Sequence, residues 1–242
     1  MPTTTMPMGL AEGIAATVRA ALDVLMPRLC PVCGKPLLGH ERWLCVRCLD
    51  RLPVTHLEDT EFNAMEQLFA GQVPVERATA YFYYEKDAPY AAILHDIKYH
   101  GMPGMGRWLA AQAARQLAPS GVLAQADCIV PVPMHRTKLA KRGYNQSERI
   151  AQGLADVLGI PVVQALTATR PHDTQTRKSA HERWVNSQGL YALSGKADVS
   201  GRNVLLVDDV VTTGATLLTC AQVLHAAGAQ VWVFTLAAAR LT

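Results

Sequence analysis

The fold is decided by the stretch Val204-Leu205-Leu206-Val207-Asp208-Asp209-Val210-Val211-Thr212-Thr213-Gly214-Ala215-Thr216. Its opening run of Val and Leu predicts a central parallel strand that is covered on both faces. Asp208 and Asp209 follow at the carboxyl end of that strand, where open α/β sheets place their ligands. The Thr and Gly residues then open a helix with hydroxyls and closely approachable N–H groups, which suit a phosphate. Two carboxylates beside a phosphate cradle indicate a phosphorylated sugar, bound through its hydroxyls or through a metal.

A simpler interpretation of the same stretch is a buried strand followed by a capped helix. The Asp and Thr residues would then serve only as turn formers and N-caps. A lone Asp-Asp or Thr-Thr-Gly would favour that interpretation. The complete run, hydrophobic residues followed by D-D-x-x-T-T-G-x-T, resembles the phosphoribosyl-pyrophosphate loop of the type I phosphoribosyltransferases. Its predicted strand–loop–helix context supports the functional interpretation.

Composition limits the possible classes of protein. A chain of 242 residues suffices for one sizeable α/β domain and a small appendage. An apolar share of 50% with 18% charged residues is typical of a soluble globular protein. The net charge of +3 makes no global case for nucleic acid, so any such case must be local. No stable membrane span and no signal peptide are expected, and the cysteine usage favours the cytoplasm.

Two CxxC pairs lie near the start of the chain, Cys30 with Cys33 and Cys45 with Cys48. Knuckles of this kind can place four thiolates in a tetrahedron around zinc. Two disulfides, an iron–sulfur or rubredoxin-type iron site, and a redox-active CxxC are the alternatives. The spacing and the lack of secretory signals favour zinc. Four protein ligands leave no open coordination position, so we expect a structural role.

We expect four parts: an amphipathic helix within residues 1–29, a zinc module at 30–52, a connection at 53–77 and the main domain at 78–242. In the main domain the pattern predicts strands at 78–84, 128–133, 161–166, from 204, and at 231–236. Predicted helices cover 89–100, 106–117, 146–158 and 215–227. Strands that alternate with helices imply right-handed crossovers in an open, mostly parallel sheet.

A basic loop follows the predicted strand at 128–133. Because it leaves the carboxyl end of that strand, it should flank the same crevice as Asp208. Its cations and side-chain amides suit a pyrophosphate or a nucleic-acid backbone, and a solvated basic face is the alternative. The candidate DNA contacts in this loop are Lys138, Lys141, Arg142 and Tyr144.

A long polar stretch at 169–187 separates two core elements. Such a loop inside a compact α/β domain is usually functional or mobile. It can fold over a bound ligand as a lid that excludes water. A disordered surface excursion is the alternative.

The order of motifs along the chain is specific: CPVCG…CxxC, YxxxxPYxxxLHxxKYxG, PVPxHxxKxxxRGYNQS, TRxxxTQTRKSxxERWxN and LLVDDVVTTGAT. It resembles the ComF family, competence-factor-related proteins of bacteria that couple a zinc module to a phosphoribosyltransferase domain. The match covers roughly residues 22–236, and its blocks occur in family order.

The resemblance implies a type I phosphoribosyltransferase fold and a phosphoribosyl pyrophosphate site. Asp208 and Asp209 would contact the ribose hydroxyls, directly or through Mg²⁺. The 5′-phosphate would lie on Thr212, Thr213, Gly214, Ala215 and Thr216. The pyrophosphate would meet the loop that contains Val132, Pro133, His135 and Arg136.

The same resemblance implies that Gln175, Arg177 and Lys178 close over the pyrophosphate. Family members usually have Thr two residues before this Gln, whereas this chain has Asp173, which puts that position's role in doubt. The implied function is Mg²⁺-dependent phosphoribosyl transfer to an unidentified acceptor, linked to DNA uptake and transformation. The alternative is a non-catalytic factor that binds or processes single-stranded DNA and uses the phosphoribosyl pyrophosphate site for regulation. Single-stranded DNA and DNA-uptake or helicase proteins are the corresponding partners.

Overall fold

The structure, a computed structural model, describes residues 27–170 and 189–240. The chain divides into two compact units, Met1–Leu52 and Pro53–Thr242. Gln175, Arg177 and Lys178 lie outside the described residues, as do residues 10–26 of the predicted N-terminal helix. Leu29, the last residue of the predicted range, forms an antiparallel bridge with Pro36.

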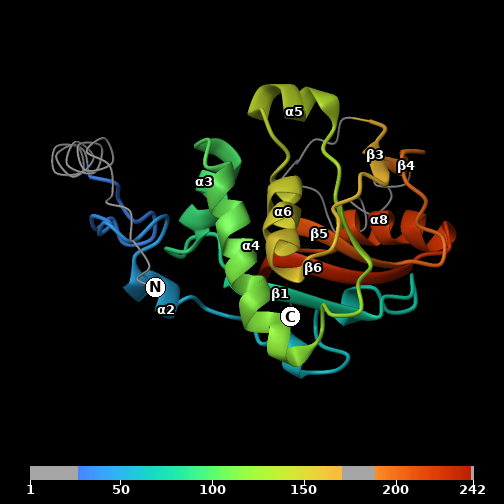
Figure 1. Cartoon of the computed structure of the whole chain (residues 1–242), viewed down its shortest axis with the longest axis horizontal. Coiled ribbons are helices and arrows are strands. Elements are labelled where there is room, and N and C mark those ends of the chain that lie inside the picture. Colours follow the sequence, from blue (N-terminus) through green and yellow to red (C-terminus); the bar gives the residue numbers. More distant parts are fainter. Residues whose placement is uncertain (1–26, 171–188, 241–242) are drawn as a thin grey trace, which may run out of the picture. The chain divides into compact units, whose positions relative to one another are not determined.

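A four-stranded parallel sheet forms the centre of the larger unit, in the order β1-β6-β5-β2 (Figure 1). Its strands are β1 (Arg77–Tyr84), β2 (Cys128–Pro131), β5 (Asn203–Val211) and β6 (Gln230–Ala239). Every pairing in it is parallel. The predicted open α/β sheet is therefore confirmed.

Helices cover both faces of this sheet. Val204 and Leu206 of β5 belong to the hydrophobic cluster that includes the apolar residues of α8 (Ala215–Ala226). Because successive strand residues point to opposite faces, the buried Leu205 and Val207 face the other side. There α4 (Pro103–Leu117) contacts β6, and α6 (Gln146–Leu158) contacts β5 and β2.

The two helices of that second face pack closely on one another, and Figure 1 shows α4 and α6 side by side. A Cβ atom added at Gly153 of α6 would lie 2.0 Å from the backbone oxygen of Arg107 in α4. Only glycine permits this approach. Helix α6 has the predicted bounds because Asn145 caps its start, accepting from the N–H of Ser147, and Gly159 follows its end with φ 72°.

Three shorter helices complete the described part of the chain, and one of them was predicted from the sequence. Helix α3 (Ala91–Tyr99) falls within the predicted range, and α2 (Val46–Asp50) lies in the smaller unit. Helix α5 (Arg136–Arg142) forms within the segment that the sequence suggests is a loop. Among the residues that the structure describes, no helix is both long enough and apolar enough to span a membrane.

The predicted strand at 161–166 is wrong. Val162 makes a single parallel bridge with Ile129, in which the N–H of Ile129 donates to the oxygen of Pro161 and that of Val163 donates to Ile129. The chain then leaves the sheet. Leu166–Ala168 (β3) pairs antiparallel with Tyr191–Leu193 (β4), so the partner of this segment lies across the long polar stretch.

Residues 53–77 belong to the larger unit and contribute to its core. They contain the short 3₁₀ helices η1 (Leu57–Asp59) and η2 (Glu66–Leu68). Met65, Phe69 and Val73 are buried in the hydrophobic cluster on the α8 face. This segment is therefore a packed part of the fold.

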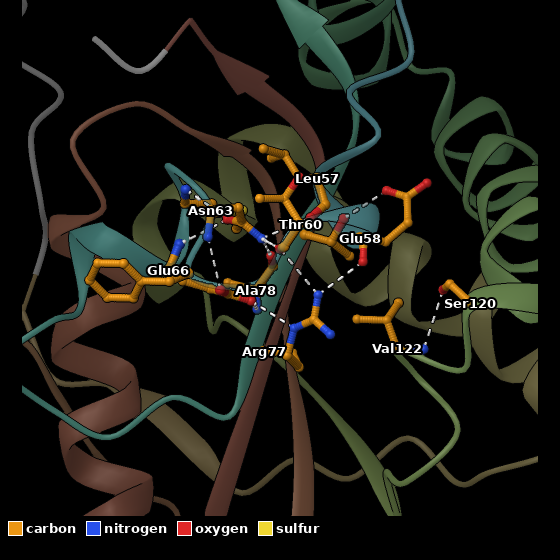
Figure 2. Close-up of polar contacts among 12 residues, drawn as sticks. Leu57, Glu58, Thr60, Asn63, Glu66, Arg77, Ala78, Ser120 and Val122 are labelled. Carbon is orange, nitrogen blue, oxygen red and sulfur yellow. Dashed lines mark hydrogen bonds and ion pairs between the residues drawn. The ribbon is translucent and has the colours of Figure 1, made fainter.

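Figure 2 shows how polar contacts hold this segment on β1. The buried side-chain amide of Asn63 donates to the oxygens of Leu57 and Ala78, both at 2.9 Å. Its oxygen accepts from the N–H groups of Met65 and Glu66. The carboxylate of Glu66 in turn pairs with Arg77, with 2.8 Å between Oε1 and Nε. The Asn63 side chain thus satisfies several backbone groups of this segment and of β1, which fixes η2 in place.

Candidate functional site

The two acidic residues lie at an edge created by unequal strand lengths. Pairing between β2 and β5 ends at Pro131 and Val207, whereas pairing between β5 and β6 continues to Val211. Asp208 and Asp209 are therefore still part of β5, beyond the end of β2. This is the carboxyl edge of a parallel sheet, where ligands of open α/β folds bind.

Each carboxylate is held by contacts from other elements. Oδ1 of Asp208 accepts from the Ser147 hydroxyl at 2.8 Å and from the N–H of Asp209 at 2.8 Å. The Gln146 amide donates to Oδ2 of Asp209 at 3.0 Å. Nζ of Lys98, on α3, lies 3.0 Å from the same oxygen. Helices α3 and α6 thus converge on the acidic pair.

The electrostatics follow from burial and from this crowding. Burial, with the neighbouring charge of Asp209, raises the pKa of Asp208 to about 7, although the Ser147 hydrogen bond acts in the opposite direction. Burial, the largest single influence, would lower the pKa of Lys98, but the carboxylates of Asp209 and Asp208 act against it and the net direction is upward. Lys98 therefore stays protonated and acts as the counterion of the two adjacent carboxylates.

The Thr/Gly loop meets the start of α8 beside this pair. Gly214 has φ 74°, a left-handed conformation that favours glycine, and its carbonyl accepts from the N–H of Leu218 at 2.8 Å. Within the described residues no side chain caps α8, so its first N–H groups are suited to an anion. Thr212 and Thr213 are exposed.

Two supports of this loop come from segments distant in sequence. A Cβ atom at Gly214 would lie 3.2 Å from Cδ1 of Leu68, so η2 backs the loop directly. On β4, the Tyr191 side chain lies near that of Thr216, and burial raises the Tyr191 pKa. The loop is held between the 53–77 segment and the β3–β4 hairpin.

The predicted pyrophosphate loop begins next to β5 and then leaves it. The N–H of Val132 donates to the Val207 oxygen at 2.9 Å, and the Val132 oxygen accepts from the Asn145 amide at 2.9 Å. Pro133 follows, half-buried. His135 caps α5, with Nδ1 accepting from the N–H of Thr137, and Arg136 is the first residue of that helix. The structure thus brings Val132, but not Arg136, next to the strand that carries the acidic pair.

The candidate DNA contacts lie on and after α5. No residue of this helix is buried, and it carries Lys138, Lys141 and Arg142. The Arg142 guanidinium lies 5.3 Å from the centre of the Tyr99 ring, which is 66% exposed. The Tyr144 hydroxyl donates to the Ile97 oxygen, so this side chain is engaged with α3. Tyr99 therefore provides an exposed aromatic ring beside the basic helix.

The smaller unit gathers the four predicted ligand cysteines. The sulfurs of Cys30, Cys33, Cys45 and Cys48 all lie within 4.8 Å of one another, and those of Cys33 and Cys45 are 3.7 Å apart. A tetrahedral zinc with Zn–S bonds of about 2.3 Å needs S–S distances of about 3.8 Å. The cluster therefore fits a four-coordinate thiophilic metal.

Local hydrogen bonds shape this cluster. The N–H of Gly34 donates to the Cys30 oxygen at 2.8 Å, with Gly34 at φ 69°. The Glu41 carboxylate accepts from the N–H groups of Leu38 and Val46, each at 2.7 Å, so it ties the turn between the knuckles to α2. Burial raises the pKa of Cys48, and buried thiolates need a neutralising cation.

Part of the site is not predictable from the local sequence pattern. Lys98, Gln146 and Ser147 all lie within the quoted motifs, but the sequence did not indicate that they converge on the acidic pair. For Lys98, the available signal was its place in the KYxG motif at the end of a predicted helix. Tyr191 had no comparable signal, because the β3–β4 pairing spans the long polar stretch.

Comparison with known proteins finds a matching domain family and several similar proteins. The phosphoribosyl transferase domain family matches residues 144–240. The chain is 31% identical over 238 residues to the DNA utilization protein YhgH of Salmonella typhi, covering 94% of this chain and 92% of that protein. It is 34% identical over 125 residues to competence protein F of Haemophilus influenzae, or 50% of this chain and 55% of that one. A solved adenine phosphoribosyltransferase from Saccharomyces cerevisiae aligns with TM-score 0.38 and 18% identity, over 71% of this chain and 87% of that one.

Replacing Lys98 tests the charge balance of the site. We expect Lys98→Met to lower the free energy of unfolding by about 3 kcal/mol, because it leaves the buried Asp209 carboxylate without its cation. Urea denaturation measures this loss. In a Lys98→Met, Asp209→Asn double variant part of the loss should be recovered, because the unpaired charge is gone.

The exposed Arg107–Asp156 pair, with 2.7 Å between Nε and Oδ2, is the matched control. Arg107→Met should cost less than about 1 kcal/mol. Equal losses for Lys98→Met with and without Asp209 would contradict a stabilising pair.

Proposed function

The chain belongs to the ComF family, whose members carry a type I phosphoribosyltransferase domain, and we propose that this domain binds phosphoribosyl pyrophosphate with Mg²⁺. One observation carries the proposal: the acidic pair on β5 adjoins a threonine loop at the uncapped start of α8. Asp208 and Asp209 would contact the ribose hydroxyls, and the loop from Thr212 to Thr216 would hold the 5′-phosphate. The residues present fit Mg²⁺, because carboxylate oxygens are the ligands that it prefers.

The proposed reaction is displacement at C1 of the ribose. An acceptor forms a bond to C1 while the C1–O bond to pyrophosphate breaks, and the pyrophosphate leaves with the electron pair. The acceptor's proton is lost to solvent. No protein nucleophile is needed, so the residues act by positioning and by stabilising charge. Mg²⁺, when bound, would neutralise the leaving pyrophosphate.

Lys98 has a defined part in this proposal. In the structure it neutralises Asp209, and Gln146 donates to the same oxygen. A ligand that engages Asp209 competes with both contacts. Lys98 would then be released from Asp209 and would lie next to the negatively charged ligand, whose phosphate groups it could neutralise.

Ligand-induced stabilisation tests the binding site. At a phosphoribosyl pyrophosphate concentration 100 times Kd, with Mg²⁺, wild type should gain about 2.7 kcal/mol and several degrees in Tm. The Asp208→Asn, Asp209→Asn variant should show no such shift, because both proposed contacts to the ribose or metal are weakened. Asp156→Asn, an exposed carboxylate elsewhere, should behave like wild type. A wild type that does not respond would contradict the site.

Pyrophosphate release then separates transfer from mere binding. The assay supplies nucleobases, ammonia or single-stranded DNA as acceptors. Acceptor-dependent release that disappears in the double Asp variant is the expected result. Binding without release from any acceptor would favour the regulatory alternative.

We propose that the four cysteines hold one structural Zn²⁺. Their sulfur distances and count support it. Four thiolates require a reducing compartment, which is the reason we place the protein in the cytoplasm.

Metal analysis of the purified chain should give about one zinc per chain. Cys45→Ser should lose it, because one of the four thiolates is removed, whereas Cys128→Ala, a buried cysteine of the sheet, should retain it. Iron in place of zinc, or no metal, would contradict the assignment.

The basic helix favours a second function, the binding of single-stranded DNA. Single-strand binders combine cations with aromatic platforms, and Tyr99 lies exposed against Arg142. The names of the relatives, a DNA utilization protein and a competence protein, support a role linked to DNA uptake. DNA-uptake or helicase proteins are the partners that such a role implies.

Salt dependence tests this second function. The logarithm of the affinity for single-stranded DNA should fall steeply with the logarithm of salt concentration. Lys141→Gln with Arg142→Gln should reduce that slope by about 1.4, the contribution of two phosphate contacts. Lys86→Gln, an exposed lysine elsewhere in the same unit, should leave it unchanged. Affinity that does not depend on salt would contradict direct binding by α5.

A further inference from the structure

The end of α3 carries three potential metal ligands that the proposed function does not use. His95, Asp96 and His100 each offer one ligand atom, a ring nitrogen or a carboxylate oxygen, and these atoms lie within 4.8 Å of one another. His100 Nδ1 is 2.6 Å from the Asp96 oxygen, and His95 Nδ1 is 4.0 Å from it. The two imidazole rings are 4.6 Å apart between centroids.

The surroundings of these ligands leave one side open. The Asp96 side chain is only 12% exposed, whereas the two histidines are more than half exposed. A buried carboxylate thus lies beneath two imidazoles that border solvent. Three protein ligands would leave a further coordination position for water.

Ordinary helix chemistry explains only part of this arrangement. A histidine at the C-terminus of a helix is favoured by the dipole, which accounts for His100 near Asp96. It does not account for His95, whose ring is turned toward both His100 and Tyr99. A second group on the surface, His56 with Glu58 and Asp59, has one imidazole and two carboxylates. Because imidazole is the better ligand for zinc-like metals, the α3 group is the stronger candidate.

We propose that His95, Asp96 and His100 form a binding site for a divalent transition metal of the zinc class. The metal would join the last turn of α3 to the residue that follows it. Lys98 lies within this same turn and reaches Asp209. Metal at this position would therefore stiffen the segment that supplies the counterion of the acidic pair. The site itself does not depend on phosphoribosyl pyrophosphate binding.

Metal titration of the full chain tests the proposal. The chain, purified with zinc already at the four cysteines, is titrated with Co²⁺ and followed by calorimetry and visible absorption. Wild type should bind one further equivalent, with Co²⁺ bands that lack the charge-transfer absorption of thiolate ligands. His95→Asn with His100→Gln should weaken this event by about 100-fold or more, since loss of even an outer-shell partner costs roughly 10–100-fold.

Two further variants make the outcome decisive. His95→Asn alone leaves the Asp96–His100 contact in place, so it removes one ligand without disturbing the helix end, and it should also weaken binding. His56→Asn, a comparably exposed histidine in the other group, should have no effect. The proposal is overturned if wild type binds no further equivalent, if binding persists in the double histidine variant, or if the added cobalt shows only thiolate ligation.

Discussion

Two carboxylates adjacent in sequence lie on a central strand, and their charge has to be balanced inside the protein. Asp209 is only 5% exposed, and a buried charge is tolerated only when it is paired and hydrogen-bonded. Lys98 supplies the cation from α3, while Gln146 and Ser147 supply donors from the first turn of α6. The position of both helix ends relative to β5 thus depends on the acidic pair. The same excess of negative charge makes the edge a place for a cation or a polyhydroxyl ligand.

The phosphate side of the site depends on packing more than on charge. Gly214 is backed by Leu68, and the position of Leu68 depends on the Asn63 and Glu66 contacts that attach η2 to β1. On the other side, β4 contacts α8, and Tyr191 packs against the hydrophobic cluster on the α8 face. The threonine loop is therefore stabilised by two segments far from it in sequence, so its shape exists before a ligand arrives. Such preorganisation reduces the cost of binding.

Local pattern was enough to predict much of this architecture. Strand 204 onward, helix 146–158 and the parallel sheet follow from hydrophobic periodicity and caps, which are local properties. The prediction of a core strand at 161–166 was wrong. The run is apolar, which favours a strand, but from Leu166 onward its pairing partner is β4, which lies beyond the polar stretch. Helix α5 was not predicted because none of its residues is buried, so its sequence has no hydrophobic periodicity. Lys98 and Tyr191 were missed for a related reason: their roles come from contacts between distant segments.

The most direct measurement of the central claim is a crystal structure of the chain with phosphoribosyl pyrophosphate and Mg²⁺. The account predicts ribose hydroxyls at Asp208 and Asp209, the 5′-phosphate on the N–H groups of the Thr212–Thr216 loop, and Lys98 displaced from its 3.0 Å contact with Asp209. Ligand bound elsewhere on the molecule, with the Lys98–Asp209 pair intact and the loop empty, would contradict it.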